Sequence, residues 1–137
     1  MSKSARLDRR QGERQDTDMQ YLLMILSDAE RWAAMPQADI DSMMKDWVPF
    51  MDSIVKAGHV RGGARLHPPA TATTVRMTGG KANQTDGPFA ESKEQLGGYL
   101  LLECENLDLA LSIAKRVPTL RAGDVVEVRP VMSTPQT

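Results

Sequence analysis

The chain has 137 residues, which is enough for one domain with its own hydrophobic core. Its 17 Lys and Arg are balanced by 18 Asp and Glu, whereas a domain that holds nucleic acid through phosphate contacts is usually basic, so we expect no nucleic-acid partner. A single cysteine, Cys104, excludes an internal disulfide and a cysteine-based zinc site. With only two histidines as well, we predict neither a metal nor a cofactor.

The two ends of the chain differ from the rest in composition. Residues 1–18 have mixed charge and almost no large apolar side chain, so they cannot offset the entropy lost on ordering, and we predict a mobile polar tail. A start at Met19, or a short element docked on a partner chain, are the alternatives. Residues 133–137 are also polar, which leaves 19–132 as the domain. No apolar run is long enough for a membrane span or a signal peptide, so we expect a cytoplasmic protein without a membrane partner.

The first half of the domain predicts a strand and a long helix. The apolar run 20–26 is typical of a strand in the centre of a sheet. Residues 27–37 are expected to form a polar connection. Apolar residues then recur every three or four positions over 40–55, which predicts a helix that ends at Gly58. Pro49 lies inside this pattern and is expected to kink the helix.

The second half predicts mostly strands. Alternating or β-branched residues and turn signals indicate strands over 59–67, 71–77, 81–85, 96–104 and 125–131, with a hairpin turn at Gly79-Gly80 and a helix from Asn106 to Val117. This order of elements predicts an α+β fold with an antiparallel sheet and helices on one face, as in ferredoxin-like protomers.

Such a sheet leaves one face without helices, and the strand patterns predict which residues lie there. The expected members are His59, Arg61, Arg65, His67, Tyr99, Leu101, Glu103, Val125, Glu127, Arg129 and Val131, with Tyr21, Leu23 and Ile25 available from the first strand. A face with this much apolar area tends to be covered. We therefore predict a homodimer with a cleft between the two sheets, the alternative being a monomer whose mixed face meets water.

Residues 86–94, which read Asp-Gly-Pro-Phe-Ala-Glu-Ser-Lys-Glu, are followed by Gly97-Gly98-Tyr99. This combination resembles the signature of the DGPF proteins, a branch of the YCII-related family, and the similarity spans about residues 20–131. The resemblance implies a bacterial protein that forms a dimeric α+β barrel from ferredoxin-like protomers and whose activity is not established. YCII-type proteins are candidate enzymes because a His–Asp pair lies in a cleft. Some DGPF relatives are associated with extracytoplasmic-function sigma factors.

Asp86 and His67 are the candidate catalytic residues. Asp86 matches the aspartate of the motif, but Asp-Gly-Pro is also good turn chemistry. The histidine that YCII proteins place after the first strand has no counterpart here, where the chain reads Ser27-Asp28-Ala29-Glu30. Histidine is a common general base in enzymes, and His67 sits at a predicted strand end, so it is either a general base or a surface histidine.

Five further residues are candidate ligand-binding groups, each with a plain alternative. Arginines can hold a carboxylate or a phosphate bidentately, or can pair across strands, for example Arg129 with Glu103. A lysine near Asp86 can tune its pKa or be solvated, and a tyrosine can donate through its hydroxyl or pack at an interface. The five are Arg65, Arg76, Lys93, Tyr99 and Arg129.

Three functions fit the sequence. The first is an enzyme that uses acid–base chemistry on a small anionic metabolite in the cleft between subunits. The second is a ligand-binding or regulatory module with the same cleft and no turnover, linked to a sigma factor. The third is an interaction protein whose open sheet face is all interface. A strongly shifted pKa of Asp86 would favour the first over the second.

Overall fold

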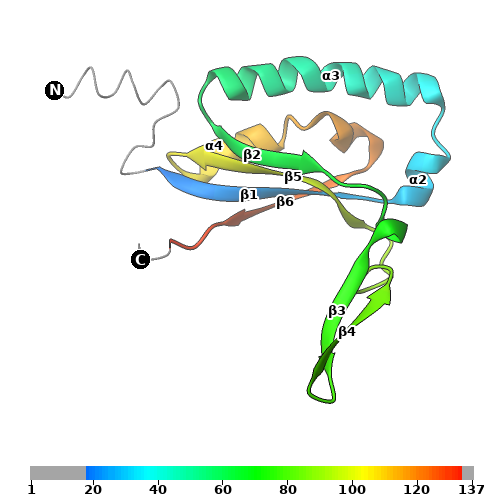
Figure 1. Cartoon of the computed structure of the whole chain (residues 1–137). Helices are drawn as coiled ribbons and strands as arrows, with labels where there is room; N and C mark the ends of the chain where they lie inside the picture. Colours follow the sequence, from blue (N-terminus) through cyan, green and yellow to red (C-terminus); the bar gives the residue numbers. More distant parts are fainter. Residues whose placement is uncertain (1–17, 134–137) are drawn as a thin grey trace.

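The computed structural model describes residues 18–133, which form a four-stranded sheet, helices on one side of it and a separate hairpin (Figure 1). The strand order is β2-β5-β1-β6, and each neighbouring pair is antiparallel. The sheet strands are β1 (Met19–Ser27), β2 (Val60–Arg65), β5 (Gln95–Cys104) and β6 (Val125–Pro130), and the hairpin strands are β3 (Thr73–Thr78) and β4 (Lys81–Asp86). The helices are α2 (Ala29–Ala33), α3 (Gln37–Lys56) and α4 (Leu107–Ala114), with short 3-10 helices η1 (Pro69–Thr71) and η2 (Pro118–Ala122).

The topology confirms the predicted mixed α+β class with antiparallel sheets. Helix α3 connects β1 to β2, and α4 connects β5 to β6, so the sheet contains two β-α-β connections that interleave. This arrangement is compatible with a ferredoxin-like fold. Between residues 18 and 133, no helix is both long enough and apolar enough to cross a bilayer. Of the predicted tails, 1–18 and 133–137, residues 1–17 and 134–137 lie outside the described part of the chain.

The hydrophobic core fills the space between the sheet and the helices. Leu23 and Leu102 on the two central strands are fully buried, as are Ile54 of α3 and Ile113 of α4. Burial of such side chains contributes about 1.5–3 kcal/mol each, so this layer supplies most of the apolar stabilisation. Cys104 is buried in the same cluster.

The prediction for the faces of β1 was wrong. Tyr21, Leu23 and Ile25 were expected on the helix-free side, but they are buried in the core. Tyr21 lies opposite Leu102 and Leu23 opposite Leu100 in the antiparallel register, and directly opposed residues point to the same face. A strand that is apolar on both sides gives no alternation from which the core face could be chosen.

The segment between β1 and α3 contains one more helix than expected. Residues 27–37 were predicted as a connection, yet Ala29–Ala33 form α2, whose N-cap Asp28 accepts hydrogen bonds from the backbone N–H groups of Glu30 and Arg31. Helix α3 then runs through Pro49 without interruption. Its apolar side is held in the core by Phe50, whose ring meets that of Trp47 edge-on at 5.3 Å.

Strand β2 contains a bulge, and the residues after it point to the opposite faces of the sheet from those that strict alternation predicts. Val60 lies opposite Leu102, but Gly62 lies opposite Leu101, so the register shifts at Arg61. Beyond the bulge, Ala64 lies opposite Tyr99, away from the helices. The clean alternation predicted for 59–67 is therefore wrong after Val60.

One glycine on each strand, Gly63 of β2 and Gly98 of β5, brings the two strands close together. A Cβ atom on Gly63 would come within 2.7 Å of the Tyr99 carbonyl oxygen and 2.8 Å of Leu100 Cδ2. A Cβ atom on Gly98 would lie 3.0 Å from the Ala64 carbonyl oxygen. The Gly97-Gly98-Tyr99 motif thus has a packing role at this strand pair.

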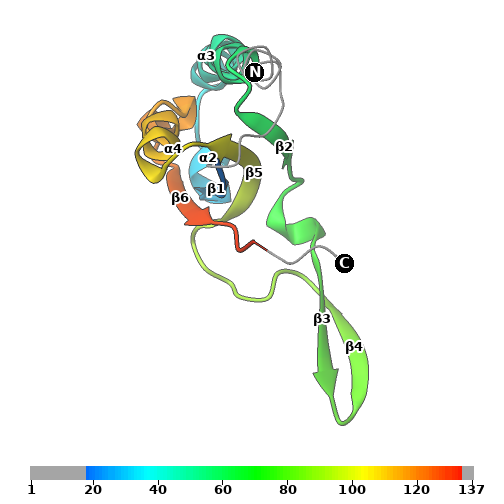
Figure 2. The same ribbon diagram turned by 90° about the vertical axis from the view of Figure 1, so that its left-hand side faces the viewer.

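Strands β3 and β4 form an arm, defined here as residues 73–86. The predicted turn is confirmed, because Gly79 and Gly80 both have positive φ angles and join the two strands. In Figures 1 and 2 the arm extends away from α3, on the helix-free side of the four-stranded sheet. The register places Thr73, Val75 and Met77 on one face of the arm with Ala82, Gln84 and Asp86, which we call the apolar arm face.

Candidate functional site

The helix-free side of the sheet carries a band of partly exposed apolar side chains. Leu22, Met24 and Leu26 of β1 alternate with the buried core residues and are partly exposed. Their neighbours across the register are Leu101, Tyr99 and Leu96 on β5, and Arg129, Glu127 and Val125 on β6. These nine residues define the open face. The expectation that Leu101 and Val125 lie here is confirmed by the register.

Tyr99 and Arg129 are the two predicted ligand-binding residues that the fold brings to the open face. Tyr99 lies opposite Met24, and Arg129 lies opposite Leu22, so they stand in adjacent rows with β1 between them. The Arg129 side chain is exposed and forms no ion pair with any residue of the part that the structure describes. A guanidinium beside apolar side chains is suited to a carboxylate or a phosphate.

A buried carboxylate lies at one end of this surface, and the sequence prediction missed its role. Glu103 is 3% exposed, and its Oε1 atom is 3.5 Å from Arg61 Nε and accepts a hydrogen bond from Gln20 Nε2 at 3.5 Å. Its Oε2 atom has no hydrogen-bond partner among the described residues. The predicted alternative pair with Arg129 is not formed, because the β2 bulge places Arg61 there instead. The sequence contained one signal for this role: the charged residue Glu103 directly follows the strand residues Tyr99–Leu102.

The Asp86-Gly87 motif forms a tight turn at the base of the arm. Gly87 adopts φ +98°, its N–H donates to the Ala72 carbonyl oxygen at 2.7 Å, and its own carbonyl accepts a hydrogen bond from the Thr74 hydroxyl at 2.7 Å. These contacts support the turn alternative for the backbone of the motif. The Asp86 side chain itself is exposed on the apolar arm face, opposite Thr73.

His67 lies in the segment that leads from β2 to the arm. It lies between the end of β2 and η1, and the Asp86-Gly87 turn is bonded to Ala72 just after η1. The imidazole is exposed, and no hydrogen bond joins it to Asp86 within residues 18–133. One protomer therefore supplies two titratable groups at the arm base without a formed acid–base pair.

The remaining candidates lie elsewhere. Arg65 was expected on the helix-free side, but the bulge turns it toward α3, where Nη1 lies 4.0 Å from Met44 Sδ. Arg76 stacks over the Phe89 ring at 5.1 Å on the other face of the arm. Lys93 is exposed and has no ion-pair partner in the described part of the chain, which agrees with the solvated alternative.

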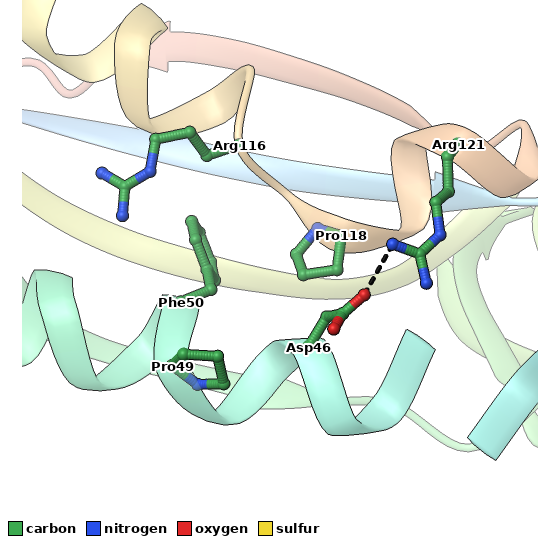
Figure 3. Close-up of a pocket in the computed structure, with 6 residues that line it drawn as sticks. All are labelled: Asp46, Pro49, Phe50, Arg116, Pro118 and Arg121. Atoms are coloured by element: carbon green, nitrogen blue, oxygen red, sulfur yellow. Dashed lines mark ion pairs between the residues drawn. The ribbon is translucent and has the colours of Figure 1, made fainter. Parts of the chain in front are cut away.

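A groove of the protomer lies on the helix side of the molecule. An open groove of about 400 Å³ runs between α3 and η2 and is lined by Asp46, Pro49, Phe50, Arg116, Pro118 and Arg121 (Figure 3). The ion pair of Arg121 with Asp46 crosses it. None of the predicted site residues lines this groove. Among residues 18–133, no three His, Cys, Asp or Glu side chains are grouped so that they could hold a metal ion.

The fold and the open face define a small α+β protein with one helix-covered sheet face and a second face rich in apolar side chains. Residues 19–134 match the YCII-related domain, and the chain belongs to this family. It is also 34% identical over 114 residues to an uncharacterized protein of Rhizobium meliloti (strain 1021), an alignment that covers 82% of this chain and 92% of the relative.

Proposed function

We propose that the protein is a homodimer that stacks two open faces and binds a small anionic metabolite at their seam. The open face is the observation that carries this proposal. Its rows combine leucines, a methionine and Tyr99 with Arg129, which has no ion-pair partner among residues 18–133, and exposed apolar areas of this kind mark interaction or ligand sites. A stacked pair would shield the apolar side chains and leave the guanidinium groups inside a low-dielectric cleft.

The chemistry of the seam favours an anion of modest size. Arg129 offers a planar fork of donors, and Tyr99 in the adjacent row offers a hydroxyl donor. At the end of the surface, the buried Oε2 atom of Glu103 has no hydrogen-bond partner among residues 18–133, so a ligand N–H or O–H group that reaches this atom would satisfy it. A small carboxylate or phosphate ester with a hydroxyl or amino group matches these three.

Acid–base catalysis by Asp86 and His67 on the bound metabolite is the more specific form of the proposal. It requires both groups to come within hydrogen-bond reach of the ligand. The alternative is a ligand-binding or regulatory module without turnover, linked to an extracytoplasmic-function sigma factor. The exposure of Asp86 and His67, and the absence of a bond between them in residues 18–133, favours this alternative for an isolated protomer.

Sedimentation equilibrium and calorimetric titration test the proposal. The wild-type protein should be a dimer at micromolar concentration, and Leu101→Glu should convert it to a monomer. Inorganic phosphate and a small hydroxycarboxylate such as malate should bind the dimer, with an affinity about tenfold lower or more for Arg129→Gln. Lys45→Gln is the matched control, since it removes one exposed positive charge on α3. A monomeric wild-type protein, or equal binding by Arg129→Gln, would overturn the proposal.

A further inference from the structure

The arm has apolar side chains that its own protomer does not cover. Val75 is 65% exposed and Met77 is 71% exposed, and both lie on the apolar arm face. The four-stranded sheet forms no ladder with either arm strand. A two-stranded hairpin is at best marginally stable in water, so an arm of this kind gains order when one of its faces packs on something else.

The direction of the arm identifies a second copy of the chain as its partner. The arm extends beyond the helix-free side of the sheet in both views (Figures 1 and 2). A second protomer stacked on the open face occupies this same side. Six residues in a strand span about 20 Å, which is long enough to lie along a neighbouring small domain.

The charges at the base of the arm are complementary to the open face. Asp86 is the acidic member of the apolar arm face, and its carboxylate is exposed. The open face offers the guanidinium of Arg129, which has no ion-pair partner among residues 18–133. An arm that crosses to the other protomer brings a carboxylate to the surface that carries this guanidinium, which has no ion-pair partner in the described part of its own chain.

From these relationships we infer that the arm of each protomer packs its apolar face on the partner protomer and presents Asp86 at the partner's open face. The ligand site is then composite, because one chain contributes Tyr99 and Arg129 while the other contributes the carboxylate. Arg76, on the opposite face of the arm, keeps its contact with the Phe89 ring and stays at the outside. The inference rests on the dimer of the proposed function and adds the arm exchange to it.

Photo-crosslinking in isotope-mixed dimers tests the arm directly. Met77 is replaced by p-benzoylphenylalanine in unlabelled protein, which is equilibrated with protein uniformly labelled with heavy nitrogen and then irradiated. We expect covalent dimers in which the arm of an unlabelled chain is joined to a peptide of a labelled chain. The same replacement at Thr85, on the other arm face, should give few such products.

A second set of variants measures the contribution of the arm to association. The double variant Val75→Asp, Met77→Asp should weaken the dimer about tenfold or more, because two buried apolar contacts are lost. Thr85→Asp adds a carboxylate to the opposite arm face and should leave the dissociation constant unchanged. Both sets of side chains are exposed in the protomer, so circular dichroism should show an unchanged fold.

The outcomes separate this inference from the proposed function. If the protein is a dimer but Met77 crosslinks only within its own chain, the arm inference is wrong while the stacked dimer stands. Equal dissociation constants for the double variant and the wild type would also overturn it. If mixed crosslinks form but anions bind equally to wild type and Arg129→Gln, the arm exchange stands and the anion site is wrong.

Discussion

Arg31 and Asp124 join α2 to the start of β6 through an ion pair with an N–O distance of 2.9 Å. The indole Nε1 of Trp32 donates to the same carboxylate oxygen, also at 2.9 Å. The Asp124 side chain is 2% exposed, so the shared acceptor is shielded from water although the Arg31 side chain stays 30% exposed. A Cβ atom on Gly123 would come within 3.0 Å of Arg31 Nε, and this glycine has φ +98°, which fixes the approach of the two elements.

Asp124→Ala should destabilise the protein by about 2–4 kcal/mol, because it leaves the donors of Arg31 and Trp32 without their acceptor. Chemical denaturation followed by circular dichroism measures this change. Asp52→Ala is the control, since it removes an exposed ion pair with Lys56 of similar N–O distance, 3.0 Å, and should cost less than about 1 kcal/mol. Equal losses of stability in the two variants would show that the ion pair of Asp124 contributes no more to stability than the exposed pair does.

Gly63→Ala should lower the stability by about 1–3 kcal/mol, because its new Cβ atom would overlap the Tyr99 carbonyl and the Leu100 side chain. The adjacent Gly62 is the matched control, with nothing within 4 Å of its Cβ position. Gly62→Ala should be neutral or slightly stabilising in the protomer. Thermal unfolding at two protein concentrations checks both, since Gly62 lies on the helix-free side and its variant could also change association. A neutral Gly63→Ala would contradict the close approach of β2 and β5.

Burial raises the pKa of the Cys104 thiol to about 11 from its usual 9.0, with smaller contributions from Asp18 and Glu103. The unfolded chain then loses this proton at lower pH than the folded chain does. The contribution of Cys104 to stability is complete below pH 9 and is lost as the pH rises through about 11. Denaturation between pH 8 and 11 should therefore show a steeper decline for wild type than for Cys104→Ala.

We also expect iodoacetamide to alkylate the Cys104 thiol slowly at pH 8 in the folded protein and rapidly only after denaturation. Parallel pH profiles for wild type and Cys104→Ala, or rapid alkylation of the folded protein, would contradict the buried environment.

Pro49→Ala should stabilise the protein by about 1–3 kcal/mol, because proline removes a backbone donor inside α3. Val48→Ala is the control: Val48 is exposed in the same turn of the helix and changes only the side-chain propensity, by less than about 1 kcal/mol. The midpoint of urea denaturation measures both. A lower midpoint for Pro49→Ala would show that the ring contributes packing in the groove beside Phe50 that outweighs the restored hydrogen bond.

Much of the fold could be predicted, because a helix with one buried side has a clear periodic pattern of apolar residues. The stripe over residues 40–55 correctly predicts α3, and Asn106 caps α4 through a hydrogen bond from the Leu109 N–H. The Gly79-Gly80 turn was also predictable, since both positions need positive φ. These features depend on residues close together in the chain.

The candidate site was less predictable because it depends on strand register. The bulge at Arg61 moved Arg65 to the helix side. The strand patterns placed Arg61 and Glu103 on the same face, but their ion pair was not predicted. Asp86 and Arg76 were both predicted as site residues, but the pairing of β3 with β4 puts them on opposite faces of the arm. One extra residue in a strand reverses every later side chain, so no local pattern could assign these positions.

The amino-acid sequence by itself determined the α+β class, the order of most elements, the hairpin turn and the family to which the chain belongs. Each of these depends on short-range periodicity or on a contiguous motif. Only the tertiary structure decided which face of β1 is buried, where the arm extends and which carboxylate lies beside which arginine. These properties are set by hydrogen-bond register and packing between segments that are distant in the chain. The contacts that stabilise them form only when those segments meet.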